Sequence, residues 1–255
     1  MKRVKRRTFS GAVCEQEIFN IRENQDIKTA QPGKERFQSE AERAAHREAI
    51  SRRRHIQLIN TNFTHNSLYS TLTLDNTNEV HYYEDMKRLR DNYIRRLQRR
   101  FPDAVISAYI GQGKNSRRFH MHMISDGIPE SAIRSLWGYG RIDRVEHLRE
   151  HNIYDGTDHG EDYTGLANYL FDHWIPEYGG HRYRITRNAA RPEKEEPKEI
   201  KRNYTEAKPP AAPKGYILVE TRSNSYGYLY FKYVRIPESR YMTRKKNRSG
   251  YYIEE

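Results

Sequence analysis

Between residues 67 and 124 the spacing of apolar positions changes along the chain, and each change predicts a new element. Leu68 to Leu74 combines aliphatic residues with Ser and Thr, which is typical of a strand. His81 to Phe101 repeats apolar residues every three or four positions, which predicts a helix. Ala104 to Ile110 and Arg118 to Ile124 predict two more strands, and the short loop between them makes them antiparallel neighbours.

Three shorter elements are predicted after Ile124. Pro129 to Trp137 predicts a short helix, Arg141 to Leu148 a strand, and Glu161 to Trp174 a helix that Pro176 stops. The order of strands and helices predicts an α+β domain over residues 61–180, an antiparallel sheet with helices packed on one side.

The first 60 residues are polar and lack sustained periodicity. Glu40 to Ile50 is a good helix former and runs into the basic residues Arg52 to Arg54. We therefore expect a basic polar arm with one helix. The arm is either a solvated extension or a phosphate-contacting one, and the sequence does not separate the two.

The last 75 residues, 181–255, predict a linker, a hairpin and a tail. Arg187 to Pro213 is dominated by Pro, Glu, Lys and Ala, which indicates a flexible linker. Tyr216 to Glu220 and Tyr226 to Ile236 are typical of a hairpin. The tail carries a basic run, Arg244 to Arg248.

The composition narrows the class of partner. The chain has 255 residues, with 46 Lys and Arg against 34 Asp and Glu, and a net charge of +12. Such a balance favours nucleic acid over a membrane, because no apolar run approaches the ~20 residues of a spanning helix. The 20 tyrosines could stack on bases. Cys14 is the single cysteine, and no apolar region follows the basic Met1 to Arg7, so we expect a soluble cytoplasmic protein.

One face of the helix at 81–101 is almost entirely basic. A charged face is most often only solvated, but a face of one sign favours nucleic acid. The candidate DNA-binding residues are those of this face together with the basic residues just before the histidine strand: Lys87, Arg88, Arg95, Arg96, Arg99, Lys114, Arg117 and Arg118.

Two histidines lie one residue apart in the strand that ends at Ile124. Because strand side chains alternate between faces, His120 and His122 point one way and Phe119, Met121 and Met123 the other. Two imidazoles on one face could share a metal ion, although neutral histidines also occur in sheets without metal. Gln112, at the end of the partner strand, is the nearest candidate for a third, oxygen ligand. This donor set suits Mn²⁺ or Mg²⁺.

The helix at 161–174 contains two tyrosines in different positions. At about 100° per residue, Tyr163 lies near the middle of the apolar face, so we expect it to pack in the core. Tyr169 lies at the border of that face, with His173 one turn further on the same side. A border tyrosine can project its hydroxyl into a cleft as a nucleophile or as a hydrogen-bond donor.

Three segments together resemble the rolling-circle replication initiators of the HUH endonuclease class. Tyr69 to Leu74 is similar to the family's first motif, Arg118 to Ile124 to its histidine–hydrophobic–histidine motif, and Leu166 to Leu170 to its tyrosine motif. The chain departs from the family in two places. Asp172 and His173 stand where many members carry a lysine, and Gln112 stands in place of a glutamate.

The resemblance implies a fold, an activity and partners. It implies an HUH-type domain that nicks and rejoins single-stranded or hairpin origin DNA through a 5′-phosphotyrosine, with Tyr169 as nucleophile and Tyr163 as a candidate second one. The metal would be held by His120 and His122. Host helicase and polymerase, in a bacterial cytoplasm, are the expected partners. A transposase or relaxase with the same chemistry, or a non-catalytic nucleic-acid-binding protein on a related fold, stays open.

Overall fold

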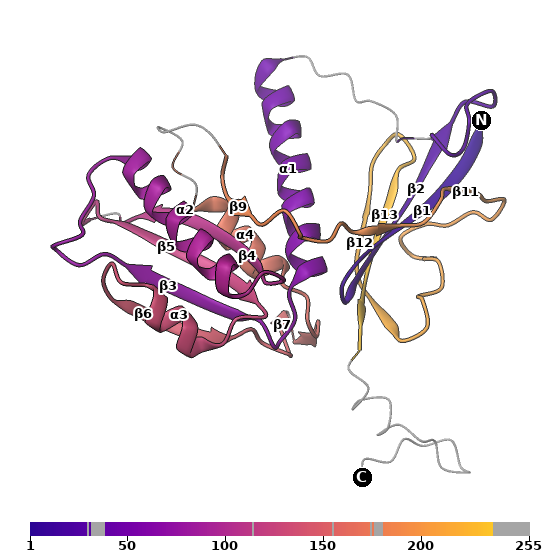
Figure 1. Ribbon diagram of the computed structural model, residues 1–255. Helices are drawn as coiled ribbons and strands as arrows, with labels where there is room; N and C mark the ends of the chain where they lie inside the picture. The colour runs from indigo at the N-terminus through magenta and orange to yellow at the C-terminus, as the bar shows by residue number, and fades with distance from the viewer. Residues whose placement is uncertain are drawn as a thin grey trace, which may run out of the picture. The chain divides into compact units, whose positions relative to one another are not determined.

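The computed structural model describes residues 1–29, 31, 39–113, 115–154, 156–173, 175 and 181–236. Lys114, Trp174 and the basic run at 244–248 lie outside these residues. The chain divides into two compact units (Figure 1). One comprises Met1–Arg43, His151–Asp162 and Pro192–Glu255, and the other comprises Ala44–Glu150 and Tyr163–Arg191. Among the described residues, none of the helices has the length and apolar character needed to span a bilayer.

The unit from Ala44 to Arg191 is built on a five-stranded antiparallel sheet in the order β6-β3-β5-β4-β9. The strands are β3 (Leu68–Thr73), β4 (Val105–Gln112), β5 (Phe119–Asp126), β6 (Ile142–His147) and β9 (Arg184–Ile185). The expected α+β class with an antiparallel sheet is confirmed, and four of these strands lie close to their predicted positions.

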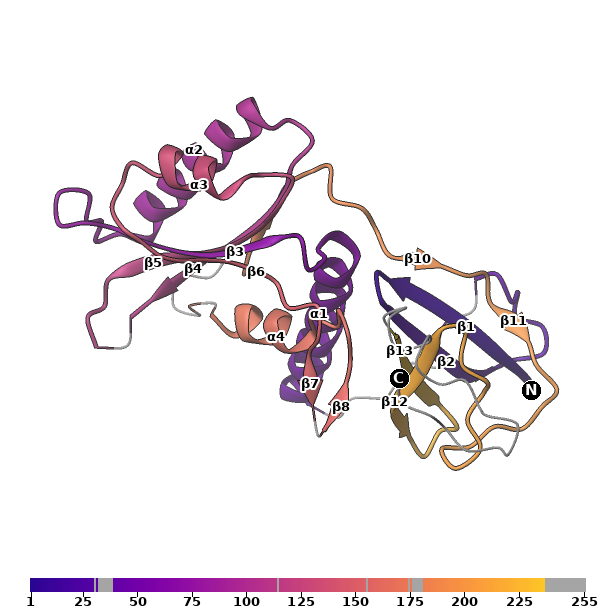
Figure 2. The ribbon, with the colours of Figure 1, turned by 90° about the horizontal axis from the view of Figure 1, so that it is seen from below.

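Helices cover both faces of this sheet, so the expectation of helices on one side is wrong (Figure 2). The helices are α1 (Glu40–Asn62), α2 (Tyr83–Arg100), α3 (Glu130–Leu136) and α4 (Thr164–Asp172). Helices α2 and α3 pack on the face that carries Leu72, Met121 and Met123. Helices α1 and α4 pack on the other face, where Tyr109 and Ile124 supply apolar surface among polar neighbours.

Helix α1 continues to Asn62, beyond the basic run Arg52 to Arg54 in which it was expected to end. Arginine is a good helix former, so the basic run at 52–54 does not stop it. His55 and Ile59 lie one turn apart on the same side of the helix, and both are fully buried. Packing on the sheet therefore extends this helix.

The other unit contains a six-stranded sheet in the order β10-β1-β2-β13-β12, with β11 also paired to β1. The strands are β1 (Lys2–Ser10), β2 (Val13–Ile21), β10 (Glu193–Lys194), β11 (Lys198–Glu199), β12 (Tyr216–Ser223) and β13 (Leu229–Arg235). A separate two-stranded sheet pairs β7 (Ile153–Tyr154) with β8 (Thr157–Asp158). The hairpin predicted at the C-terminal end is β12 and β13.

The expected polar arm is wrong over residues 2–21, which form two strands of this sheet. Both strands carry charged side chains inward, which hides the alternation typical of a strand. Arg6 on β1 forms an ion pair of 2.8 Å with Glu17 on β2, and the hydroxyl of Tyr230 donates to Glu15 at 2.8 Å. Such cross-strand partners satisfy buried charges, but they cannot be inferred from one strand alone.

The expected linker at 187–213 is also wrong over part of its length. Strands β10 and β11 hydrogen-bond to β1, and the hydroxyl of Tyr233 donates to the carbonyl of Pro210 at 3.0 Å. Ile200 and Tyr204 pack on a cluster that includes Cys14 and Phe231. A polar, proline-containing segment thus serves as the edge and cover of a sheet.

Candidate metal centre and nucleophile

His120 and His122 project from β5 on the face of the sheet that α1 and α4 cover, as strand alternation predicts. His120 lies opposite Thr73 of β3 and Gly111 of β4, and His122 lies opposite Thr71 and Tyr109. Their neighbours Phe119, Met121 and Met123 are buried on the α2 side of the sheet. The imidazoles of His120 and His122 are 4.9 Å apart between ring centroids.

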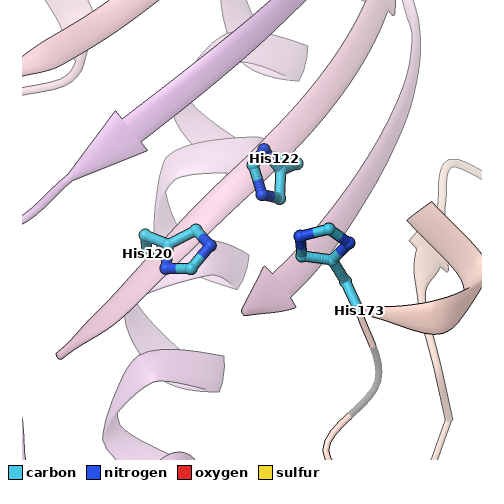
Figure 3. A group of neighbouring side chains, drawn as sticks. All are labelled: His120, His122 and His173. Carbon is cyan, nitrogen blue, oxygen red and sulfur yellow. The ribbon is translucent and has the colours of Figure 1, made fainter. Parts of the chain in front are cut away.

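A third histidine completes the cluster. His173 caps the C-terminal end of α4 and faces the two strand histidines (Figure 3). One ring nitrogen from each of His120, His122 and His173 lies within 4.8 Å of the other two. This group could hold a metal ion. The sequence placed His173 beside Tyr169 on the helix but did not mark it as a ligand, because the packing of α4 on the sheet was not known.

Gln112 does not supply the third ligand. It lies opposite Phe119, so its side chain points to the α2 side of the sheet, and its Nε2 donates to the carbonyl of Arg117 at 2.7 Å. The residue on the histidine face at this point is Gly111. A Cβ at that position would lie 2.5 Å from Nε2 of His120, so the glycine leaves the space that this imidazole occupies.

Hydrogen bonds orient the imidazoles of His173 and His122 for metal binding. Nδ1 of His173 lies 2.8 Å from the carbonyl of Tyr169; a carbonyl only accepts, so Nδ1 carries a proton and Nε2 is the nitrogen whose lone pair can bind a metal. Nδ1 of His122 lies 2.7 Å from the hydroxyl of Tyr69. Nε2 of His122 is buried and, within the described part of the chain, has no hydrogen-bond partner. A metal ion would satisfy this orphaned nitrogen.

The electrostatic environment keeps the strand histidines neutral. Burial, together with the neighbouring His120 and His173, lowers the pKa of His122 to about 3. Burial also lowers the pKa of His120, again with a contribution from His173. Neutral imidazole is the form that binds a metal, so these two residues present lone pairs at neutral pH.

Tyr169 lies beside this cluster. Its side chain is 49% exposed, its ring centroid is 4.2 Å from that of His173, and the distance to the ring of His122 is 5.8 Å. The hydroxyl of this residue is therefore available to a ligand that reaches the histidines.

Tyr163 is in the core, as its position on the helix predicts. It is buried, its backbone N–H donates to Asn60, and its hydroxyl donates to the carbonyl of Arg149 at 3.1 Å. It precedes His173 by ten residues, which is about 15 Å along a helix axis. The structure therefore gives no support to Tyr163 as a second nucleophile.

Arg52 of α1 contacts the C-terminal end of helix α4. Arg52 forms an ion pair of 2.6 Å with Asp172, and its guanidinium stacks on the ring of Phe171 at 4.7 Å. The hydrogen bond to Arg52 holds the pKa of Asp172 below its ordinary value. The carboxylate of Asp172 is thus paired with α1, and this contact fixes the end of α4 that carries Tyr169 and His173.

The basic face of α2 lies on the side of the sheet opposite the histidines. Within that predicted DNA-binding set, Lys87 and Arg88 pair with Glu84 and Asp85 of the same helix, and Arg96 stacks on Tyr139 at 4.6 Å. The other members on α2 are Arg95 and Arg99. None of these residues can contact a phosphate bound at the histidines without the DNA passing round the sheet.

Arg117 and Arg118, which precede β5 and were expected to bind DNA, make other contacts. Arg118 is engaged with the carbonyl of Leu74 at 3.0 Å and with Glu79 at 3.2 Å. Arg117 adopts a positive φ of 54° in the loop and accepts the Gln112 hydrogen bond at its carbonyl. Neither contact places a guanidinium at the histidine cluster.

Arg144 is a basic residue that the sheet register brings to the histidine face. Thr71 is the strand partner of both His122 and Arg144, so the three residues form a row across the sheet. At the usual strand spacing, the Cα atoms of Arg144 and His122 are about 10 Å apart. A register shift between β3 and β6 occurs at this point, and it cannot be inferred from the spacing of residues along either strand.

No protein-family model, curated protein or solved structure matches this chain.

Proposed function

We propose that this protein is a metal-dependent endonuclease and strand transferase that nicks single-stranded DNA through Tyr169, on an HUH-type fold, and so initiates rolling-circle replication. The observation that supports this proposal best is the half-exposed Tyr169 ring 4.2 Å from His173 and 5.8 Å from His122. A tyrosine nucleophile next to a cluster of imidazoles that can hold a divalent metal is the pairing that this chemistry needs.

The histidines and Tyr169 would have separate roles in the reaction. A divalent cation held by His120, His122 and His173 would act as a Lewis acid on a non-bridging oxygen of the scissile phosphate. Tyr169 attacks phosphorus, the bond to the 3′-oxygen breaks, and the products are a 5′-phosphotyrosine and a free 3′-hydroxyl. The phenol, with a pKa of about 10, is a better leaving group than an alcohol, so the strand can be rejoined.

The donor set refines the choice of metal. Three imidazole nitrogens suit Mn²⁺, or a later transition metal, better than Mg²⁺, which prefers an octahedral shell of oxygen ligands. The proposal therefore specifies Mn²⁺ as the activating ion and Mg²⁺ as a weak substitute.

One observation favours a second candidate function. Three histidines around one metal ion, with water in the fourth position, are also the ligand set of enzymes that use a metal-bound water as nucleophile. In that case the protein would be a phosphodiester hydrolase, and Tyr169 would only position the substrate. Such an enzyme would cut DNA without forming a covalent intermediate.

The test uses the full-length protein and a pool of single-stranded oligonucleotides with Mn²⁺. The proposal predicts a protein–DNA species that survives denaturation, disappears with chelator, and is absent in His122→Ala. Cleavage without any such species supports the hydrolase, and neither cleavage nor adduct across the pool rejects both candidates.

A further inference from the structure

The cationic side chains on the two faces of the β1-β2-β13 sheet differ in whether they form ion pairs. On one face, Arg6 pairs with Glu17 at 2.8 Å and Lys232 pairs with Asp162 at 2.6 Å. On the other face, three cations of β1 point the same way because they are two residues apart: Arg3, Lys5 and Arg7. In the described part of the chain, none of these three makes an ion pair within 4 Å.

The side chains of Arg3 and Arg7 are nonetheless held in place by hydrogen bonds. Arg7 donates from Nε to the side-chain oxygen of Gln16 at 2.8 Å. Arg3 donates to the side-chain oxygen of Asn203 at 3.2 Å and to the carbonyl of Tyr204 at 3.3 Å. Because all three acceptors are neutral, the guanidinium groups are oriented but keep their full charge. Fixed, unneutralised donors are what an anion site requires.

Further cations adjoin this row. Lys198 of β11 is the direct strand partner of Lys5, and Arg202 stacks on the ring of Tyr204 at 5.9 Å. Like charges directly opposite one another on a sheet are destabilising. The pKa of Lys5 reflects this, since burial lowers it first and Arg7 and Lys198 lower it further, against one nearby carboxylate, Glu195. The fold thus keeps repelling charges together.

We propose that this cationic patch, formed by Arg3, Lys5, Arg7, Lys198 and Arg202, is a second nucleic-acid-binding surface that contacts the phosphate backbone without metal. The cations of β1 repeat in a line every ~7 Å, which fits a linear polyanion better than a single small anion.

The same features argue against an acidic membrane as the partner. Membrane-surface binding combines charge with apolar side chains that enter the lipid. Among the described residues, the exposed large apolar side chains are Met1, Ile50, Tyr82, Ile153, Tyr154, Tyr169 and Tyr226, and none belongs to the strands or segment that form the patch.

The test compares Lys5→Gln/Lys198→Gln with Lys208→Gln/Lys214→Gln, which removes the same charge from exposed positions of the same unit. All proteins carry Tyr169→Phe, and the binding of a labelled single strand is followed in chelator. Failure of the nicking activity therefore leaves this measurement intact. Phosphatidylserine vesicles serve as a separate probe.

The patch variant is expected to lose roughly 20-fold in affinity at about 0.1 M salt, and its salt slope should fall by about 1.4, the effect of two lost phosphate contacts. Its melting temperature should not fall, because the substitution removes a repulsion. Equal affinity of both variants, or a loss confined to vesicles, would overturn the proposal. If the double variant does not fold, Lys198→Gln alone, at an exposed position of β11, carries the test with about half the change in slope.

Discussion

The hydroxyl of Tyr69 lies 2.7 Å from Nδ1 of His122, and the two rings are nearly parallel, 14° apart in plane. This contact fixes the orientation of the imidazole whose other nitrogen, Nε2, is buried without a partner among the described residues. When Nδ1 donates its proton to the tyrosine, Nε2 presents its lone pair to the centre of the histidine cluster. Tyr69 is thus a positioning residue for the proposed metal.

Removing this hydroxyl should weaken metal binding. Tyr69→Phe keeps the stacked ring but loses the hydrogen bond, and such outer contacts typically change metal affinity 10- to 100-fold. Titration with Mn²⁺, followed by calorimetry, measures the effect. Thr71→Val is the matched comparison, because its hydroxyl is 3.3 Å from the same nitrogen and should matter less. Equal Mn²⁺ affinity of Tyr69→Phe and wild type would remove this role.

Gly111 provides a steric test of the same centre. An added Cβ would lie 2.5 Å from Nε2 and 2.9 Å from Cε1 of His120, so Gly111→Ala should displace that imidazole. We expect at least a tenfold loss of Mn²⁺ affinity with little change in thermal stability, since no positive φ is involved. Gly138→Ala, with no atom within 4 Å of the new methyl, is the control. Unchanged affinity in Gly111→Ala would contradict the described position of His120.

The face of the sheet that receives DNA can be identified with two arginines. Arg144 shares the histidine face, whereas Arg99 lies on α2 on the other side. Arg144→Ala should lower the rate of adduct formation at subsaturating DNA by about fivefold to tenfold, on the order of 1 kcal/mol, and Arg99→Ala should not change it. The reverse ranking would mean that the basic face of α2 leads the substrate to the site.

Acid should destabilise the fold through buried histidines. Burial lowers the pKa of His55 and of His122 from 6.5 to about 3. In the unfolded chain these histidines are protonated below about pH 6.5, whereas in the folded chain they are protonated only near pH 3. The free energy of unfolding therefore decreases progressively as the pH falls from 6.5 to 3.

The size of this effect can be measured at one histidine. Near pH 5 each such residue contributes about 1.4 kcal/mol per pH unit to the free energy of unfolding. Urea unfolding at several pH values should show that His55→Gln reduces the slope by this amount. His81→Gln, which removes an exposed histidine, should keep the wild-type slope. A full slope in His55→Gln would show that this imidazole is charged in the folded protein.

Local periodicity was sufficient for part of this site. Alternation placed His120 and His122 on one face of a strand, and helical geometry separated the buried Tyr163 from the half-exposed Tyr169. These inferences depend only on neighbours in the sequence. The class of fold followed from the order of such elements.

The predictions that were wrong concern features that depend on contacts between distant segments of the chain. Gln112 was a reasonable ligand until the β4-β5 register placed it opposite Phe119, and His173 became part of the cluster only because α4 packs on the sheet. Strands β1 and β2 were missed because their charged residues find partners across strands, as Arg6 does with Glu17. Neither a register nor a cross-strand partner is encoded in local spacing.

The central claim is that Tyr169 becomes covalently attached to DNA. Wild type, Tyr169→Phe and Tyr163→Phe are incubated with single-stranded DNA and Mn²⁺, and the adduct is digested and mapped by mass spectrometry. We expect a phosphonucleotide on the peptide that contains Tyr169, lost in Tyr169→Phe and formed at the wild-type position in any folded Tyr163→Phe. An adduct that persists in Tyr169→Phe, or that maps to another residue, would contradict it.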